Sequence, residues 1–146
     1  MGGGNVGALN TFKEVGKGAG IAVLLADVAK GVAAVAIALW LLDVSQLFVL
    51  AAGLAVVVGH NWSVFLKFTG GKGMAATIGA LATLMLYYGY WQGLLIFIGV
   101  IAVVLVATRN IALSTGVALL SLPFIAWLGM KSGPFIIFAV IFIWVL

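Results

Sequence analysis

A short glycine-rich segment around Lys72 is the part of the sequence best suited to bind an anion. It reads Thr69-Gly70-Gly71-Lys72-Gly73 and leads directly into an apolar run that begins at Met74. The first N–H groups of a helix have no partner within that helix, so they and the Lys72 ammonium would converge on one negative group. A Walker A loop is excluded, because Leu66 replaces its first glycine and Gly73 the Ser or Thr after its lysine. We predict a phosphate site, with a tight turn and a topology lysine as the alternative.

Three further polar segments lie next to apolar runs. They are Gly3-Gly4-Asn5-Val6-Gly7-Ala8-Leu9-Asn10, Gly59-His60-Asn61 and Arg109-Asn110. Asn side chains among glycines let a ligand approach the backbone closely, although glycine-rich chain starts are also often disordered. His60 is the single histidine, and a hydrogen bond to a neighbouring helix explains it as well as chemistry does. No carboxylate lies near it in the sequence, and Phe65 five positions on excludes a His-x4-Asp catalytic dyad.

Asp27 and Lys30 are charged residues within an apolar run. Three residues apart, they share one face of a helix. An unpaired charge at the centre of a membrane helix costs about 2.5 kcal/mol or more on insertion scales. We predict that they face inward as a structural ion pair, with direct ligand contact as the alternative.

These residues are set in a chain that is too apolar for water. Of its 146 residues, 66% are hydrophobic and 7% are charged, and the mean hydropathy is +1.37, whereas soluble domains carry about 25% charged residues. Apolar runs approach the roughly 20 residues that cross a bilayer. The sequence therefore predicts an all-α polytopic membrane bundle, residues 1–146 forming a single domain. Its six apolar segments are Gly20–Leu42, Leu47–Leu66, Met74–Tyr90, Gly93–Ala107, Ser114–Leu128 and Pro134–Leu146.

The basic residues predict the orientation of this bundle. They lie between apolar runs instead of forming a stripe, so the net charge of +4 does not indicate nucleic-acid binding. With alternating segments, the positive-inside rule places one set of loops, and the polar segments in them, on the cytoplasmic face. Cysteine is absent, which excludes disulfides and thiolate metal sites, and we predict no metal site. The basic residues on the predicted cytoplasmic face are Lys13, Lys17, Lys67, Lys72 and Arg109.

The order of these motifs resembles the acyl-phosphate glycerol-3-phosphate acyltransferases of bacteria, the PlsY family. That family has a Ser-Gly-Asn-x-Gly-Ala-Thr-Asn loop, then Asp-x-x-Lys-Gly in a helix, then Gly-His-x-x-x-x-Phe-Leu-x-Phe-x-Gly-Gly-Lys-Gly-x-Ala-Thr. The corresponding segments here are Gly3 to Asn10, Asp27 to Gly31, and Gly59 to Thr77. Gly3, Leu9, Lys13 and Ala112 depart from the pattern, and each loses a hydroxyl or a bidentate fork. The family's first helix and its last cytoplasmic motif have no counterpart, so the resemblance predicts a fragment lacking both.

The resemblance implies transfer of a fatty acyl group from acyl phosphate to sn-glycerol 3-phosphate at the bacterial inner membrane, giving lysophosphatidic acid without cofactor or metal. A peripheral enzyme that forms acyl phosphate is the implied protein partner. Lys72, Asn5, Asn10 and His60 would be catalytic, holding a phosphate and orienting polar groups. The substrate-binding set would be Gly4, Gly7, Lys13, Asn61, Gly70, Gly71, Gly73, Thr77 and Arg109.

Two other functions fit parts of the sequence. A transporter or channel for a small phosphorylated solute would use the same helix-end anion site, but it needs polar groups through the bilayer midplane. Apart from Asp27 and Lys30, the apolar segments supply almost none. An inactive paralogue would explain the four departures from the family pattern.

Overall fold

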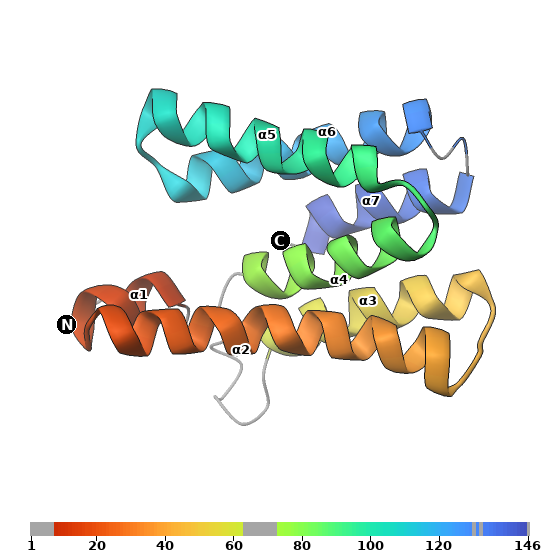
Figure 1. Ribbon diagram of the computed structural model, residues 1–146, viewed down its shortest axis with the longest axis horizontal. Helices are drawn as coiled ribbons and strands as arrows, with labels where there is room; N and C mark the ends of the chain where they lie inside the picture. Colours follow the sequence, from red (N-terminus) through yellow and green to blue (C-terminus); the bar gives the residue numbers. More distant parts are fainter. Residues whose placement is uncertain (1–7, 63–72, 130, 132, 146) are drawn as a thin grey trace. The chain divides into compact units, whose positions relative to one another are not determined.

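The computed structural model describes residues 8–62, 73–129, 131 and 133–145, and every regular element within them is a helix. Contacts between residues group the chain into two compact units, Met1–Thr83 and Leu84–Val145. The helices are α1 (Ala8–Glu14), α2 (Lys17–Ala36), its π-helical continuation η1 (Ile37–Leu41), α3 (Gln46–Asn61), α4 (Met74–Tyr87), α5 (Trp91–Thr108), α6 (Ile111–Gly129) and α7 (Gly133–Val145) (Figure 1).

The first unit is built around α2. Gly16, with a φ of 129°, separates α1 from α2 and lets α1 fold back along it. Phe12 of α1 lies against Gly20, where an added Cβ would come within 2.6 Å of the Phe12 Cβ. The other half of α2 packs with α3, which returns after a turn containing Asp43 (Figure 1). Both halves of α2 therefore have a helical partner.

The first part of α4 makes an unusually close contact with α2. A Cβ added to Gly31 would clash with the Ala76 carbonyl of α4, and one added to Gly79 would clash with the Val28 carbonyl of α2. Small residues allow membrane helices to approach to backbone contact in this way. Ala76 and Ala80 are themselves fully buried. The crossing therefore holds the start of α4 at the middle of α2.

The second unit combines α5, α6 and α7 around aromatic side chains. Phe97 and Phe142 are almost completely buried, and Tyr88 packs edge-on against Phe135 at a ring separation of 5.2 Å. The Tyr90 ring lies against Gly93 and Gly129, where an added Cβ would clash with it. This packing ties the turn before α5 to the end of α6.

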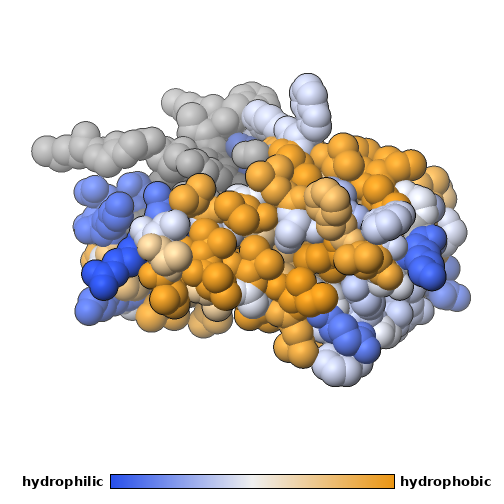
Figure 2. All heavy atoms as spheres, turned by 90° about the horizontal axis from the view of Figure 1, so that it is seen from above, coloured by the Kyte–Doolittle hydropathy of each residue, from blue (hydrophilic) through white to orange (hydrophobic). Residues whose placement is uncertain are grey.

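Large apolar side chains are exposed on both units, as expected for surfaces that face lipid. The face in Figure 2 is covered mainly by hydrophobic residues. Lys17–Leu41 and Trp91–Thr108 are long and apolar enough to cross a membrane, and four other described helices are apolar but shorter. The prediction of an all-α chain is confirmed for the described residues, and the number of spans stays a prediction.

Each predicted apolar segment corresponds to one helix, with α2 and η1 together forming the first. The second ends at Asn61 instead of Leu66, and residues 63–66 lie outside the described part. The resemblance matches Gly3 to Asn10 with a loop of the family, but the last three of these residues are helical, because α1 begins at Ala8. Residues 8–14 contain no glycine or proline, so nothing in them prevents a helix. Packing of Phe12 on α2 stabilises this short helix, which the polar residues of the segment did not indicate.

Candidate functional site

The middle of α2 carries a polar cluster. Asp27 and Lys30 are three residues apart on one face, and the Lys30 Nζ lies 2.7 Å from the Asp27 Oδ1. About ten residues of α2 precede Asp27, which places it roughly 15 Å from the start of the helix. The helix spacing alone brings this pair together, as the sequence predicted, while its role as a structural pair or a ligand contact stays open.

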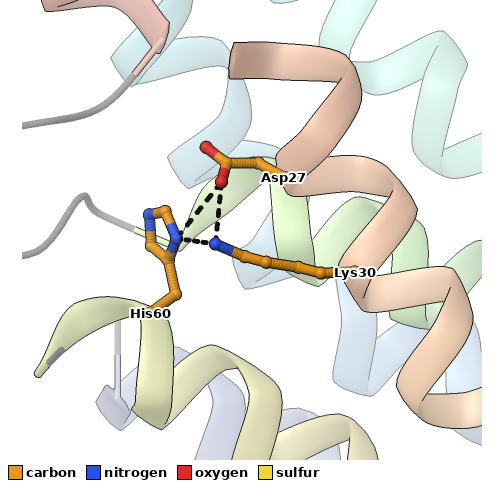
Figure 3. Close-up of polar contacts among 3 residues, drawn as sticks. All are labelled: Asp27, Lys30 and His60. Atoms are coloured by element: carbon orange, nitrogen blue, oxygen red, sulfur yellow. Dashed lines mark hydrogen bonds and ion pairs between the residues drawn. The ribbon is translucent and has the colours of Figure 1, made fainter. Parts of the chain in front are cut away.

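His60 completes the cluster from the last turn of α3. Its Nδ1 makes a hydrogen bond with the Lys30 Nζ and lies 3.4 Å from the Asp27 Oδ1 (Figure 3). The side chains of His60 and Asp27 are only 10% and 12% exposed, while that of Lys30 is 37% exposed. The absence of a carboxylate near His60 in the sequence is therefore misleading, because the α2–α3 packing supplies one. We call Asp27, Lys30 and His60 the charged cluster.

Thr77 lies in the first turn of α4, next to the α2–α4 crossing. It is 0% exposed, and its Oγ1 has no hydrogen-bond partner among the described residues. Several other hydroxyls in the described helices, those of Thr83, Thr115 and Ser114, each donate to a carbonyl of their own helix. A buried hydroxyl without a partner costs about 1–3 kcal/mol. Such a group is typical of a position where a ligand or water supplies the missing bond.

Gly73 explains how the chain enters α4. Its φ of 61° is in the left-handed region, where a side chain is unfavourable, so glycine is the residue that fits. The Gly73 carbonyl accepts the first helical hydrogen bond from the Thr77 N–H at 2.8 Å. The glycine-rich segment thus ends at the first turn that contains Thr77.

Three more predicted site residues lie in the first unit. Asn61 is the last residue of α3, directly after His60, and its Oδ1 is buried. Asn10 is half-buried in α1, and Lys13 is exposed in the last turn of that helix. No described contact joins Asn10 or Lys13 to the charged cluster.

Arg109 belongs to the second unit, where it ends α5 with a left-handed φ of 54° and is exposed. Asn110 follows it and caps α6, since its Oδ1 accepts a hydrogen bond from the Leu113 N–H at 3.1 Å. The remaining predicted site residues lie outside the described part of the chain: Lys72, Asn5, Gly4, Gly7, Gly70 and Gly71.

The described part of the site combines the Lys30 ammonium, the His60 imidazole and the buried Thr77 hydroxyl. Lys30 and the Thr77 hydroxyl can both donate hydrogen bonds, and ammonium groups and hydroxyls suit phosphate oxygens. The Asp27 carboxylate neutralises Lys30, so the charged cluster does not offer an unpaired cation for an anionic ligand. The arrangement is suited to orienting polar groups of a ligand near the start of α4.

Comparison with known proteins gives a consistent result. The family model described as Glycerol-3-phosphate acyltransferase matches residues 1–146. Glycerol-3-phosphate acyltransferase 1 of Dehalococcoides mccartyi is 52% identical over 132 residues, which is 90% of this chain and 64% of that protein. A second enzyme of that organism, glycerol-3-phosphate acyltransferase 2, is 40% identical over 94% of this chain and 62% of its own length. The chain thus spans less than two thirds of the length of these two relatives.

The fold is also that of a solved membrane protein. The crystal structure of PlsY, an integral membrane glycerol 3-phosphate acyltransferase, in its glycerol 3-phosphate form, has a TM-score of 0.87 to this chain at 26% sequence identity. The similarity covers 99% of this chain and 70% of that one. The lysophosphatidic acid form of the same protein gives a TM-score of 0.84. The all-helical fold described above is therefore that of an integral membrane protein.

Proposed function

Because the chain belongs to the glycerol-3-phosphate acyltransferase family, we propose that it transfers a fatty acyl group from acyl phosphate to the first hydroxyl of sn-glycerol 3-phosphate. The product is lysophosphatidic acid, and the step begins phospholipid synthesis. The observation that carries the proposal is the family match over residues 1–146, and the 52% identity to a bacterial acyltransferase supports it.

Phosphate recognition is assigned to the start of α4. Acyl phosphate is already activated, so the protein mainly has to hold two phosphorylated substrates and bring the hydroxyl to the carbonyl carbon. Lys72 and the N–H groups at the start of α4 bind one phosphate and stabilise the charge that develops. The Thr77 hydroxyl, which has no partner among the described residues, supports this assignment, because a phosphate oxygen would supply the missing hydrogen bond.

The other predicted residues have supporting roles in this proposal. Asn5 and Asn10 orient polar groups of the substrates, while His60 and Asn61 shape the pocket next to Asp27 and Lys30. The acyl chain stays among the lipid-facing helices, whose large apolar side chains are exposed. A peripheral enzyme that makes acyl phosphate would deliver this donor from the cytoplasmic side of the bacterial membrane.

A transfer assay in lipid vesicles tests the function. The chain is supplied with acyl phosphate and radiolabelled glycerol 3-phosphate, and lysophosphatidic acid is the expected product. We expect Lys72→Ala to lower the rate by about 100-fold or more, as for other positioned groups that stabilise developing charge. Lys131→Ala, which removes an exposed lysine from the second unit, is the matched control and should leave the rate unchanged. Binding of glycerol 3-phosphate without any transfer would favour the inactive paralogue.

The proposed orientation places Lys13, Lys67, Lys72 and Arg109 on the cytoplasmic side and Lys131 on the opposite side. The chain has no cysteine, so single cysteines can be introduced without a background. Arg109→Cys and Lys131→Cys form a matched pair, since both residues are exposed and have positive φ angles of 54° and 45°. We expect an impermeant thiol reagent to label them from opposite sides, and labelling from the same side would contradict the proposed topology.

A further inference from the structure

The contacts of His60 determine which of its ring nitrogens carries a proton. The Lys30 ammonium has three donors and no acceptor, so it can only donate to its neighbours. It lies 2.7 Å from the Asp27 Oδ1 and also makes a hydrogen bond with the His60 Nδ1. The His60 Nδ1 must therefore accept this bond with its lone pair, which leaves the ring proton on the Nε2.

The other protonation states of His60 fit the cluster less well. A proton on the Nδ1 would point at the Lys30 ammonium, which cannot accept it. The Asp27 Oδ1 is 3.4 Å from the Nδ1, longer than an ordinary N–H···O bond, and it already accepts from Lys30 at 2.7 Å. Asp27 and Lys30 are the charged groups that contact His60 among the described residues, so the tautomer depends on this pair.

We propose that Asp27 and Lys30 are positioning residues that hold His60 as the neutral Nε2–H tautomer, so that His60 gives the site a hydrogen-bond donor and not a general base. Asp27 fixes the Lys30 ammonium, and Lys30 occupies the Nδ1 lone pair. With its proton already on the Nε2, the ring cannot take the proton of an attacking hydroxyl there. Both members of the Asp-x-x-Lys pair thus act on the site through His60.

The orientation of the His60 ring indicates which group its Nε2–H can contact. In Figure 3 the second ring nitrogen of His60 lies on the side of the ring that faces away from Asp27 and Lys30. No contact of this nitrogen occurs among the described residues. An N–H donor suits an oxygen of a phosphorylated substrate, either the acyl phosphate or glycerol 3-phosphate. This choice of ligand rests on the proposed function, whereas the tautomer does not.

Nitrogen-15 NMR of histidine-labelled protein in lipid tests the tautomer directly. His60 is the single histidine, so its two ring nitrogens need no further assignment to a residue. At neutral pH we expect the chemical shifts of an unprotonated Nδ1 and a protonated Nε2. A protonated Nδ1 in the wild-type chain, as the other tautomer or as imidazolium, would overturn the proposal whether or not the chain transfers acyl groups.

Removal of the lysine should change this spectrum. Lys30→Met keeps the aliphatic length and frees the Nδ1, which can then carry a proton and face the Asp27 carboxylate. We expect the Nδ1 to become protonated in this variant and to stay unprotonated in the matched control, Lys131→Met. An unchanged tautomer in Lys30→Met would show that Lys30 does not position the ring, and the proposal would fail.

The donor role is tested by ligands and by substitution. Glycerol 3-phosphate and a non-hydrolysable acyl phosphonate are added separately, and we expect one of them to shift the Nε2–H resonance, which identifies the substrate that it contacts. If neither shifts it, the donor role is wrong. In the transfer assay, His60→Gln retains an amide donor near the Nε2 position and should keep at least tenfold more activity than His60→Ala. Equal losses in both variants would also contradict a donor role.

Discussion

The first unit of the chain, Met1–Thr83, buries a charged residue and a hydroxyl that has no partner among the described residues. In the described part of the second unit, Leu84–Val145, the buried polar side chains are hydroxyls that are hydrogen-bonded to their own helix. Asp27 and Thr77 belong to the first group, and Ser114 and Thr115 to the second. Satisfied hydroxyls cost little in an apolar bundle, while unsatisfied or charged groups are expensive. The comparison indicates that the first unit carries the polar chemistry.

The two units also use glycine differently. In the first, Gly31 and Gly79 make room for the backbone of a neighbouring helix. In the second, Gly93 and Gly129 make room for the ring of Tyr90. A ring at the end of a side chain can move more easily than the backbone of a packed helix. The α2–α4 crossing carries the candidate site. We therefore expect it to tolerate substitution of its glycines less well than the contacts of Tyr90 do.

The largest expected effect on the free energy of unfolding comes from adding a side chain to a glycine at the α2–α4 crossing. In Gly31→Ala the new methyl group would meet the Ala76 carbonyl, and separating two packed helices should lower the free energy of unfolding by about 3 kcal/mol. Gly99→Ala in α5 is the matched control, because nothing lies within 4 Å of its added Cβ. It should raise the free energy of unfolding by about 0.5–1 kcal/mol through helix propensity. Denaturation in detergent micelles measures both free energies, and equal effects would contradict the close packing of the α2–α4 crossing.

Loss of the carboxylate from the charged cluster should have the next largest effect. Asp27→Ala leaves the Lys30 ammonium in the bundle without its counter-ion, and breaking a buried pair costs about 3–5 kcal/mol. Lys30 is 37% exposed, so solvent or headgroups reduce the expected loss to about 2 kcal/mol. Ser114→Ala in the second unit, which loses one hydrogen bond within α6, should cost about 1 kcal/mol.

A double substitution gives an internal check on the Asp27 prediction. Lys30→Met in the Asp27→Ala background removes the unpaired charge and should recover part of the lost free energy of unfolding. If the two substitutions were simply additive, the ion pair would contribute nothing to the difference between the units.

Replacing a buried threonine by valine should have the smallest effect on the free energy of unfolding. The sign of this effect should differ between the two units. Thr77→Val removes a buried hydroxyl that has no partner among the described residues, and it should raise the free energy of unfolding by about 1 kcal/mol. Thr115→Val removes the hydroxyl that donates to the Ile111 carbonyl at 2.8 Å and should lower it by about 1 kcal/mol. Binding of glycerol 3-phosphate, measured by calorimetry, should weaken in Thr77→Val alone. A stabilised variant with unchanged binding would assign Thr77 to packing only.

Much of the helical framework follows from the sequence. Long apolar runs predict helices because a membrane core leaves the backbone no partner except itself. The i,i+3 spacing places Asp27 and Lys30 on one face, and the 2.7 Å contact between them is within the reach of that spacing. Gly73 before an apolar run marks the start of α4 for the same local reason, since its left-handed φ favours glycine.

The contact of His60 with Asp27 and Lys30 is decided only by the tertiary structure. Thirty residues separate His60 from Lys30, and the apolar faces of α2 and α3 give no residue-level signal of which turns meet. The sequence also does not show that the Thr77 hydroxyl lacks a partner in the described part of the chain, because a threonine in a helix usually bonds back to its own turn. Local spacing determines what one helix can present, whereas the packing of helices against each other determines which groups meet.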